Sequence, residues 1–351
     1  MEPVRVGVIG CGVIGRHHLA TAVESPEVEL IAAADLIEAN REAARDQFRP
    51  RRVYASGDEL LHDEEVEAVV LAFPTRGRTE MALKAFSAGK HVLTEKPVAM
   101  NAQEVRRMIA AKGELVAACC SSRYRFTEGA RRATEFLATG ALGELRVVRH
   151  RNLQPAGPKP EQPRPEWRLK KALNGGGYLV NWGCYDLDYL LGITGWKLRP
   201  RTVFAQTWRC PPVFESHIAP GSDAETHYIA LVRCEGGTVL SLERSEYTPA
   251  ERDEAWGIFG SQGSLQLFMT ARRENRILYT AGDEEEGAQT QVLWEGTETR
   301  SVHSGPLPDF ARAIRTGREP MTSLEKALII QQITDAVYAS AERGTAVEIE
   351  E

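Results

Sequence analysis

The segment Val4–Gly15 reads VRVGVIGCGVIG, and it decides the fold of the first third of the chain. Its first half, Val4–Ile9, is a short apolar run followed by glycine, a pattern typical of a buried strand. Gly10, Gly12 and Gly15 then form the pattern GxGxxG, directly after this strand and at the start of a helical pattern. In that setting the first glycine permits a tight turn, the second lets the backbone approach a pyrophosphate, and the third allows close helix packing.

An acidic residue lies at the spacing that nucleotide binding requires. Val13 and Ile14 open the helix, whose free backbone N–H groups would face the phosphates. Asp35 comes 20 residues after Gly15, at the end of the second predicted strand, where a carboxylate binds the adenosine ribose hydroxyls. A carboxylate repels a 2′-phosphate, and the two apolar residues after Asp35 supply no cation to bind one. NAD is therefore the expected cofactor, and NADP is less favoured.

Strands and helices alternate through residues 1–123, which we predict to be a dinucleotide-binding Rossmann domain of the α/β class. Apolar strands separated by helices are typical of a doubly wound parallel sheet covered on both faces. Ligands of such sheets bind beyond the carboxyl ends of the strands. The further elements expected here are strands at 30–34, 68–73, 91–94 and 115–120, and helices at 13–23, 38–47, 79–88 and 101–112, the last capped by Asn101.

Residues 124–351 are predicted to form a second, α+β domain for substrate binding and oligomerisation. Consecutive strands without intervening helices predict a mainly antiparallel sheet, with hairpin turns at Gly236–Gly237 and Asp283–Glu286. A closing helix at 322–343, with Thr322 and Glu325 as its capping box and Gly344 as its end, is expected to pack back on the first domain. The strands are expected at 145–151, 203–208, 226–233, 238–245, 256–260, 264–267 and 277–279, and helices at 128–138 and 178–191.

Composition and charge exclude several classes of protein. The chain has 351 residues, of which 42% are hydrophobic, and a formal net charge of −6, so nothing suggests a basic surface for nucleic acid or anionic membranes. Its longest apolar runs have six residues, whereas a membrane span needs roughly 20. The N-terminus lacks a signal-peptide pattern. We therefore expect a cytoplasmic protein with no nucleic-acid or membrane partner.

The six cysteines form no CxxC pair, and the eight histidines show no metal-binding spacing. We interpret the cysteines as small buried hydrophobic residues in a reducing compartment. No metal site is expected.

The motif Thr94-Glu95-Lys96-Pro97 stands at the end of a predicted strand. Pro97 keeps Lys96 out of helical geometry, and the Lys–Pro peptide bond can be cis. A lysine here would point into the crevice in which a nicotinamide lies, where it can bind a substrate hydroxyl and help to move its proton. From position alone, a surface lysine in a strand-ending turn is an equally good interpretation.

A further motif, GGGYLVNWGCYDLD at 175–188, leads three glycines into a helix. Asn181 and Tyr185 are four residues apart, and Tyr185 and Asp188 are three apart, so the three side chains share one helix face. A polar face on an otherwise apolar helix either lines a pocket or faces solvent.

In this order the motifs resemble those of the Gfo/Idh/MocA oxidoreductases, and the resemblance covers nearly the whole chain. It rests on GxGxxG, Asp35, Glu95-Lys96-Pro97 and the 175–188 motif, with further agreement at 88–93, 125–126, 140–143, 167–169 and 340–344. The resemblance implies a Rossmann domain followed by a domain with a large open-faced sheet. In this family that sheet often forms the interface of homodimers or homotetramers.

The resemblance also assigns roles to single residues. The family's catalytic lysine corresponds to Lys96, and its substrate-side helix carries Asn181, Tyr185 and Asp188 in this chain. Asn181 stands where the family has an acidic residue, Tyr185 where the usual catalytic residue is histidine, and Arg78 where histidine is frequent. Further cofactor contacts are expected from Pro74, Thr75, Glu95 and Lys96, and further substrate contacts from Lys96, Arg123, Trp167 and Arg168.

The resulting hypothesis is hydride transfer between NAD and a carbinol of a sugar, cyclitol or related polyol. Tyr185, assisted by Lys96, would take the hydroxyl proton, while Asn181 orients the substrate or this pair. Two alternatives remain open. One is a non-redox, glycosidase-type enzyme that retains NAD, and the other is a catalytically silent regulatory protein that binds a dinucleotide or sugar.

Overall fold

The computed structural model describes residues 2–270, 275–298 and 301–350. It divides into two compact units, residues 1–123 with 301–331, and residues 124–300 with 332–351. The sequence analysis placed all of 124–351 in the second domain, and the grouping of 301–331 with the first unit corrects that assignment. None of the helices within the described ranges has the length and apolar character that a membrane span requires.

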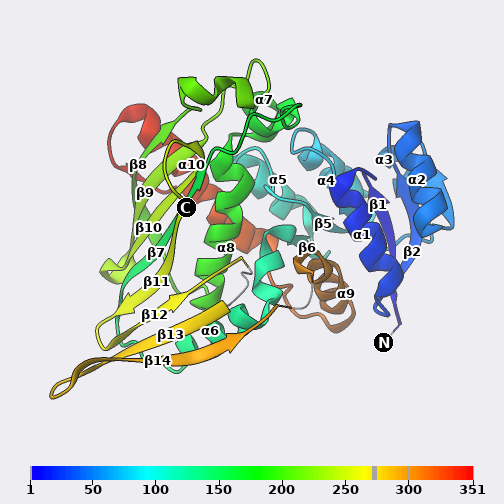
Figure 1. Ribbon diagram of the computed structural model, residues 1–351. Coiled ribbons are helices and arrows are strands. Elements are labelled where there is room, and N and C mark those ends of the chain that lie inside the picture. The colour runs from blue at the N-terminus through cyan, green and yellow to red at the C-terminus, as the bar shows by residue number, and fades with distance from the viewer. Residues whose placement is uncertain (1, 271–274, 299–300, 351) are drawn as a thin grey trace. The chain divides into compact units, whose positions relative to one another are not determined.

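The first unit is built on a six-stranded sheet in the order β3-β2-β1-β4-β5-β6, in which every neighbouring pair is parallel (Figure 1). This confirms the predicted doubly wound sheet. Because β1 lies between β2 and β4, the strand order reverses there, and ligands of such sheets bind beyond the carboxyl ends at that point. The strands are β1 (Val4–Ile9), β2 (Val28–Ala34), β3 (Arg52–Tyr54), β4 (Ala68–Leu71), β5 (His91–Thr94) and β6 (Ala117–Cys119).

Helices cover both faces of this sheet, and each face has its own apolar core. One core includes Phe86 and Met108 from α4 and α5, and the other includes Leu19 and Phe310 from α1 and α9. The helices are α1 (Val13–Glu24), α2 (Glu38–Phe48), α3 (Gly57–Leu61), α4 (Arg78–Ser87), α5 (Ala102–Lys112) and α9 (Pro306–Thr316), with the short turn η6 (Val302–Ser304).

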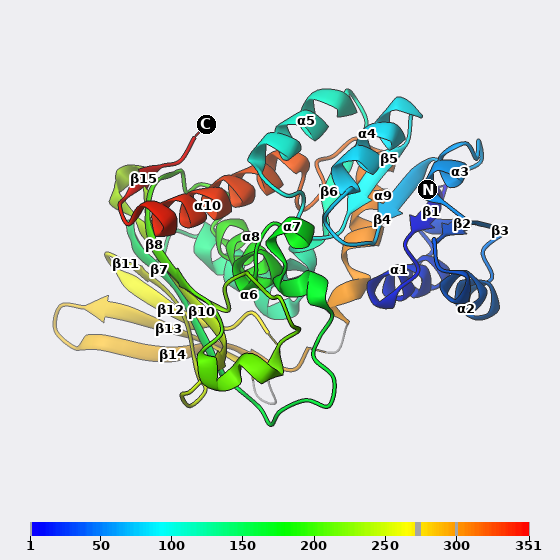
Figure 2. The same ribbon diagram turned by 90° about the horizontal axis from the view of Figure 1, so that it is seen from above.

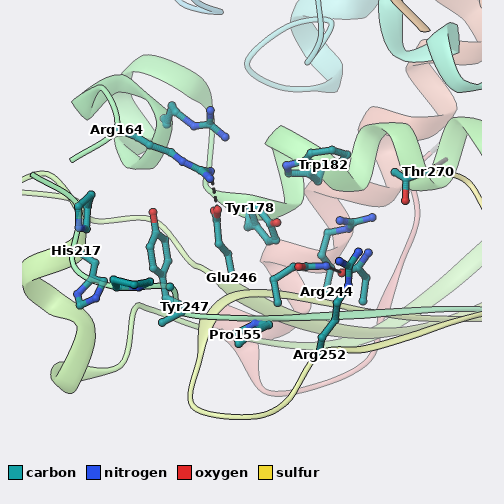
Figure 3. Close-up of a pocket in the computed structure, with 17 residues that line it drawn as sticks. Pro155, Arg164, Tyr178, Trp182, His217, Arg244, Glu246, Tyr247, Arg252 and Thr270 are labelled. Carbon is teal, nitrogen blue, oxygen red and sulfur yellow. Dashed lines mark hydrogen bonds and ion pairs between the residues drawn. The ribbon is translucent and has the colours of Figure 1, made fainter. Parts of the chain in front are cut away.

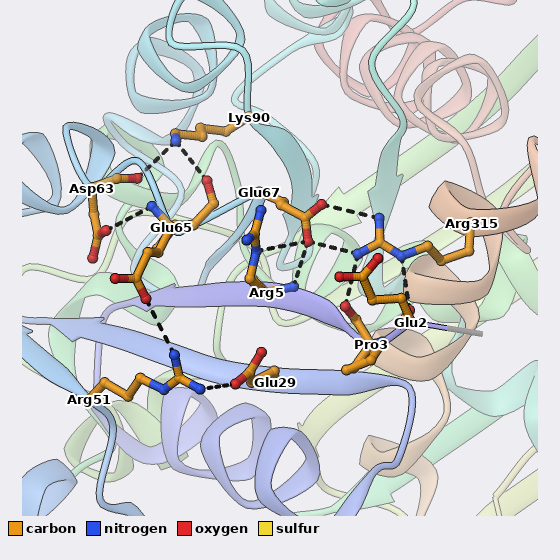
Figure 4. Close-up of polar contacts among 11 residues, drawn as sticks. Glu2, Pro3, Arg5, Glu29, Arg51, Asp63, Glu65, Glu67, Lys90 and Arg315 are labelled. Carbon is orange, nitrogen blue, oxygen red and sulfur yellow. Dashed lines mark hydrogen bonds and ion pairs between the residues drawn. The ribbon is translucent and has the colours of Figure 1, made fainter.

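Three elements of this unit, β3, α3 and α9, were not predicted. The side chains of β3 are only half-buried, so no apolar run marks this edge strand. The position of α9 depends on contacts that are distant in sequence (Figure 4). Arg315 donates to Oε2 of Glu67 at 2.7 Å and to the carbonyl oxygen of Pro3 at 2.8 Å, which ties α9 to the amino ends of β4 and β1. A separation of 248 residues between Arg315 and Glu67 leaves no local signal for this packing.

The second unit contains a nine-stranded sheet in the order β14-β13-β12-β11-β7-β10-β9-β8-β15. Its β7 and β10 are parallel, and the other neighbouring pairs of described strands are antiparallel, which confirms a mainly antiparallel sheet. The strands are β7 (Leu145–Pro155), β8 (Pro200–Trp208), β9 (His227–Cys234), β10 (Val239–Thr248), β11 (Asp253–Gly260), β12 (Gly263–Leu267), β13 (Asn275–Asp283), β14 (Gly287–Gly296) and β15 (Val347–Glu348).

Both predicted turns of this sheet are confirmed. Gly236 and Gly237 have φ values of +74° and +90° between β9 and β10. Asp283 begins the turn between β13 and β14, since its Oδ1 accepts hydrogen bonds from the backbone of Glu285 and Glu286 at 2.9 and 2.8 Å. The second strand of that hairpin, β14, was missed because its side chains are mostly exposed and no apolar alternation marks it.

The predicted helix over 178–191 is divided in the structure. A π-helical turn, η3, is followed by the α-helix α8, and Figure 2 shows α6 and α8 beside one face of the sheet. Apart from α6 and α8, the helical segments that lie wholly within this unit have seven residues or fewer each. The segments are α6 (Glu128–Ala138), η2 (Glu166–Leu169), α7 (Lys171–Asn174), η3 (Leu179–Gly183), α8 (Cys184–Ile193), η4 (Pro212–His217) and η5 (Glu235–Gly237).

Two helical segments, η1 (Cys120–Phe126) and α10 (Leu324–Arg343), contribute residues to both units. The start of α10 belongs to the first unit, where Leu324 and Ala327 join one apolar core. The predicted cap is shifted by one residue, because Oγ of Ser323 accepts the hydrogen bond from the backbone N–H of Lys326 at 3.4 Å. Gly344, with φ of +66°, ends the helix as predicted.

Candidate active site

The glycine loop after β1 has the geometry of a dinucleotide cradle. Gly10 has φ of +95°, and a Cβ there would lie 2.6 Å from the carbonyl oxygen of Ala72. A Cβ on Gly15 would lie 1.8 Å from the carbonyl oxygen of Gly10, so only glycine lets α1 pack this closely. A Cβ on Gly12 would meet no described atom within 4 Å, and no side chain caps the N-terminus of α1. The loop is therefore open where a pyrophosphate would approach it.

Asp35 holds this loop together with the turn after β2. Its Oδ2 accepts a hydrogen bond from the backbone N–H of Cys11 at 2.7 Å, and its Oδ1 accepts one from Ile37 at 2.8 Å. The guanidinium of Arg41 donates to the carbonyl oxygens of Asp35 and Leu36 at 2.8 and 3.1 Å. Sequence reasoning considered only the two residues after Asp35, and it missed this cation one helical turn further on.

A cavity of about 560 Å³ lies beside the carboxyl ends of β1, β2 and β4. Gly10, Gly12, Asp35 and Pro74 all line it, which brings together four of the residues predicted to bind the cofactor. Val13, in the first turn of α1, has 83% of its surface exposed. A carboxylate at the end of β2, an open glycine loop and an apolar cavity are features that fit the adenosine half of NAD.

The turn that carries Lys96 is fixed from beneath by a buried arginine. Lys96 itself is half-buried, and the peptide bond between Lys96 and Pro97 is cis, as the sequence allowed. Arg78 is 1% exposed, and its guanidinium donates to the carbonyl oxygens of Glu95 and Lys96. It also donates to Oγ1 of Thr75 at 2.8 Å, so that this predicted cofactor residue takes part in the same network.

Glu95 is the centre of a buried polar cluster. Its Oε1 lies 2.6 Å from Nη2 of Arg123 and 2.9 Å from Nε2 of His18, and its Oε2 accepts from the backbone N–H of Lys96. Burial would raise the pKa of this carboxyl, but Arg123 and His18 outweigh it and hold the pKa well below its ordinary value. Arg123, a predicted substrate residue, is thus held in a buried ion pair. Cys120 also adjoins His18, and burial raises the pKa of its thiol.

His18, Glu95 and Cys120 bring potential metal ligands within 4.8 Å of one another. The carboxylate of this set is already neutralised by the Arg123 guanidinium, which lies closer to Oε1 than the histidine does. A cation at this position would meet the positive charge of Arg123, so the cluster fits an ion-pair network better than a metal centre.

In the second unit, a buried carboxylate caps the helix that carries the third motif. Glu225 is 4% exposed, and it accepts hydrogen bonds from the backbone N–H groups of Gly177 and Leu179. A Cβ on Gly177 would lie 2.0 Å from the carbonyl oxygen of Glu225, which explains one glycine of the motif. Tyr338 donates to the same carboxylate at 2.9 Å. A negative charge at a helix N-terminus is stabilising, so Glu225 fixes where the helix begins.

Asn181, Tyr185 and Asp188 are all buried, with exposures of 3%, 4% and 0%, which excludes the interpretation that they face solvent. The side-chain amide of Asn181 donates to the carbonyl oxygens of Arg168 and Gly177 at 2.8 and 3.0 Å. Asn181 thereby joins the start of the helix to η2.

Aromatic and charged neighbours surround the other two residues of this face. Tyr185 packs edge-on against Tyr124 and Trp182, with ring centroids 5.2 and 5.7 Å apart. Oδ1 of Asp188 lies 3.9 Å from Nη1 of Arg125, an arginine in the stretch that the family resemblance included. The two residues are therefore packed within the core of the unit, and neither is among the described residues that line the cavity of this unit.

A cavity of about 860 Å³ in the second unit lies between this helix and the ends of β7 and β10 (Figure 3). Tyr178 and Trp182 line it from the helix, and Arg168 lines it from η2. Glu246 and Tyr247 line it from β10, at a position where the pairing with β7 is interrupted between Ser245 and Thr248. Tyr247 has φ of +61°, a conformation that is strained for a non-glycine residue and frequent at functional sites.

Comparison with known proteins decides the family. The model of the oxidoreductase family with an NAD-binding Rossmann fold matches residues 4–119, and the model of the GFO/IDH/MocA C-terminal domain matches residues 130–266. The chain belongs to the Gfo/Idh/MocA oxidoreductases.

Named relatives of this family member align along its whole length. It is similar to myo-inositol 2-dehydrogenase of Thermotoga maritima, with 25% identity over 99% of both chains. It is also similar to levoglucosan dehydrogenase of Pseudarthrobacter phenanthrenivorans, with 24% identity over 99% of both chains. A solved complex of levoglucosan dehydrogenase with NADH and levoglucosan has the same fold, with a TM-score of 0.82, 22% identity and full coverage of both chains. The chain is thus an oxidoreductase with an NAD-binding domain.

Several residues of this Gfo/Idh/MocA protein were missed by sequence reasoning. Asp186 and Arg244 form a fully buried pair, in which two guanidinium nitrogens each lie 2.6 Å from a carboxylate oxygen. Arg244 neighbours His150, and burial together with that cation holds the pKa of this histidine well below its ordinary value. Single charged residues in strands carry no motif, so only the sheet pairing reveals them. Trp167, a predicted substrate residue, is half-buried in η2, and it is not among the described residues that line this cavity.

Proposed function

We propose that this protein is an NAD-dependent dehydrogenase or reductase that interconverts a carbinol and a ketone of a sugar, cyclitol or related polyol. The observation that carries this proposal is a lysine at the carboxyl end of β5 in the same sheet as the dinucleotide cradle. Lys96 stands two residues after the end of β5, and β5 pairs with β4, whose carboxyl end adjoins the cavity of 560 Å³. The names of relatives, such as D-glucoside 3-dehydrogenase of Escherichia coli, agree with this substrate class.

When bound, NAD supplies a nicotinamide C4 that accepts or returns the hydride. We propose that the Lys96 ammonium hydrogen-bonds the substrate oxygen, and that Tyr185 takes the hydroxyl proton during oxidation and returns it during reduction. Asn181 cannot act as a base, and its amide already donates to the carbonyl oxygens of Arg168 and Gly177. We therefore assign Asn181 a positioning role, and Asp188 with it, because its carboxylate lies near Arg125.

The remaining predicted contacts, apart from that of Trp167, are retained as parts of this proposal. Pro74 and the glycine loop would bind the adenosine half of NAD, while Thr75 and Glu95 would fix the turn that presents Lys96. Arg168 would bind substrate directly, since it lines the cavity of the second unit. Arg123 would hold the side chain of Glu95, whose other carboxylate oxygen accepts the hydrogen bond from the backbone of Lys96.

The test is a set of turnover assays with NAD or NADP and a panel of inositols, aldoses and their keto forms, followed by nicotinamide absorbance. NADH binding, measured by fluorescence, is the control. Reduction of NAD by one stereochemical class supports the proposal. NADH binding without turnover across the panel contradicts it, and cleavage of glycosides without net NADH would instead identify the glycosidase-type alternative.

We also propose that the protein is a homodimer or homotetramer through the outer face of the second sheet. Side chains of β8 and β9 alternate between the core and this face, and Phe204 pairs with Leu231 in register across them. The exposed fractions of Phe204, Trp208, Ile229 and Leu231 are 55%, 46%, 40% and 48%. Large apolar side chains gathered on one sheet face are typical of a surface that a partner covers.

A further inference from the structure

The cavity of the second unit, which Figure 3 shows in close-up, has more positive than negative charge in its wall. Its charged lining consists of Arg164, Arg168, Arg244, Arg252 and Glu246. The hydroxyl groups of a neutral sugar or cyclitol can accept hydrogen bonds from a guanidinium group, but they do not neutralise its charge. The carboxylates that pair with each arginine therefore determine how much positive charge remains for a ligand to neutralise.

Two of the four arginines pair with carboxylates that are not part of the cavity lining. Arg244 pairs with the fully buried Asp186, with two contacts of 2.6 Å. Arg252 is 59% exposed at its side chain, and its Nη2 lies 3.2 Å from Oε2 of the buried Glu254. These two pairs leave no net charge toward the cavity.

For the other two arginines, Arg164 and Arg168, the cavity lining offers only one carboxylate, that of Glu246. Nη1 of Arg164 lies 2.5 Å from Oε1 of Glu246, and this pair spans the cavity wall in Figure 3. Arg168 is half-buried, and no hydrogen bond or ion pair within 4.0 Å is found for its guanidinium among the described residues. Burial lowers the pKa of Arg168, and the neighbouring charge of Arg164 lowers it further. An arginine nevertheless stays charged in proteins.

The guanidinium of Arg168 is thus partly removed from water, and no ion pair within the described part of the chain compensates for its lost hydration. A ligand carboxylate would accept two parallel N–H bonds from such a group, which is the geometry that guanidinium groups favour. Tyr178, Trp182 and Tyr247 add aromatic walls for the body of the ligand. Nδ1 of His217, which lines the same cavity, has no hydrogen-bond partner among the described residues and could bind a hydroxyl group.

We infer that this cavity binds a sugar or cyclitol that carries one carboxylate, and that Arg168 is the residue that selects it. The inference rests on the proposed function for the identity of the cavity as the substrate site. One uncompensated charge matches a carboxylate, whereas a phosphate dianion would leave a negative charge in excess. Arg168 is a specificity-determining residue in this account, and the oxidised carbon is not specified by it.

The test measures binding apart from chemistry. The full-length protein, saturated with NADH so that a carbinol cannot be oxidised, is titrated calorimetrically with D-glucuronate, D-galacturonate and D-gluconate. Each acid is paired with its neutral amide, which has nearly the same shape. We expect at least one acid to bind tenfold to a hundredfold more tightly than its amide, as charged hydrogen bonds typically give. A preference below threefold in every pair overturns the inference.

Variants then assign the preference to Arg168. Arg168→Gln should reduce the acid preference to below threefold, chiefly by weakening the acid, while Arg168→Lys should keep part of it. The matched control is Arg199→Gln, which removes the same charge from an exposed arginine outside the cavity lining and should keep the full preference. An undiminished preference in Arg168→Gln contradicts the inference. If Arg168→Gln does not fold, the result for Arg168→Lys decides, and a full preference there contradicts a bidentate contact.

Turnover assays on the same compounds separate this inference from the proposed function. If neutral polyols reduce NAD and no acid is preferred, the inference fails and the proposed function stands. If an acid binds selectively through Arg168 but no compound reduces NAD, the acid site stands and the dehydrogenase proposal fails.

Discussion

The buried guanidinium of Arg78 donates a hydrogen bond to the backbone carbonyl oxygen of Lys96 at 3.3 Å. The same group donates to the carbonyl oxygen of Glu95, so one side chain of α4 holds both residues at the end of β5. Sequence analysis identified Arg78 only as a departure from a family pattern. In the structure, Arg78 holds in place the backbone that carries Lys96, the candidate catalytic lysine.

Replacing Arg78 should therefore lower the rate of catalysis, even though the proposed role of Arg78 involves no contact with the substrate. In Arg78→Met the two carbonyl oxygens lose a buried donor, and we expect a loss of about 1–3 kcal/mol in stability. We also expect kcat to fall roughly tenfold or more, because a small displacement of a catalytic group is costly. Steady-state kinetics and urea unfolding measure both effects. Arg76→Met, which removes an exposed arginine just before α4, is the control, and equal losses in both variants would contradict this role.

Lys96→Met tests the proposed proton chemistry. Because the ammonium is proposed to bind the reacting oxygen, its loss should lower turnover by about 10²–10⁴-fold. NADH binding should stay nearly unchanged, since the cavity beside the glycine loop is lined by other residues. Lys84→Met, which removes an exposed lysine from α4, provides the control. Full activity of Lys96→Met would exclude the mechanism.

Asp35 should control the choice between NAD and NADP. In Asp35→Ser the ribose loses a carboxylate acceptor and a 2′-phosphate no longer meets a negative charge, so affinity for NAD should fall about tenfold and the preference should move toward NADP. Arg41, held 2.8 Å from the carbonyl oxygen of Asp35, is the cation available to a 2′-phosphate. The gain for NADP should therefore disappear in the double variant with Arg41→Met. Fluorescence titration with both reduced cofactors measures these affinities, with Asp46→Ser as the control; an unchanged ratio in Asp35→Ser would refute the assignment.

The geometry of the glycine loop and of Asp35 beside it was predictable from sequence, because each belongs to a local motif. Gly10 and Gly15 allow the close backbone approaches that their spacing predicts, and Asp35 accepts a hydrogen bond from the backbone of the same loop. The same holds for the doubly wound sheet, since apolar strands and intervening helices each leave a periodic signal.

The substrate side was predictable only in part. The helix with Asn181 and Tyr185 was found, but Glu246 and Tyr247 reach the cavity through a break in the pairing of β7 with β10. Arg244 forms its buried ion pair with Asp186, a residue that lies 58 positions earlier in the sequence. Such positions follow from long-range strand pairing, which a single sequence does not display. The sequence likewise singled out Arg168, but not the imbalance of charge around it.

The ion pair between Glu95 and Arg123 should make stability depend on pH in a defined direction. The pKa of Glu95 is held well below its ordinary value, mainly by Arg123 and His18 against the effect of burial. A carboxylate with a lowered folded pKa stabilises the protein above its unfolded pKa of about 4.3, and this contribution is lost as the pH falls further. Unfolding free energy should accordingly decline below about pH 4.3, beyond the decline that exposed carboxylates cause.

Arg123→Met isolates that contribution. Removing one partner of a buried pair leaves an uncompensated charge and should cost about 3–5 kcal/mol at pH 7. Urea unfolding at pH 7, 4 and 3 should show a smaller decline in stability toward low pH in the variant than in the unaltered protein. Arg131→Met removes an exposed arginine that pairs with Glu128, and it should cost less than about 1 kcal/mol. Similar costs for both variants would contradict the buried ion pair.

The outer face of the second sheet should determine the oligomeric state. Leu231 lies in the middle of β9 and faces Phe204 of β8, so an aspartate at either position would place a charge in the proposed interface. We expect sedimentation velocity to show a dimer or tetramer for the unaltered chain and a monomer for Leu231→Asp. Val23→Asp introduces the same charge at an apolar residue of α1 with 58% exposure, and it should leave the assembly intact. A monomeric unaltered chain at micromolar concentration, or a Leu231→Asp variant that assembles normally, would show that this apolar face has another purpose.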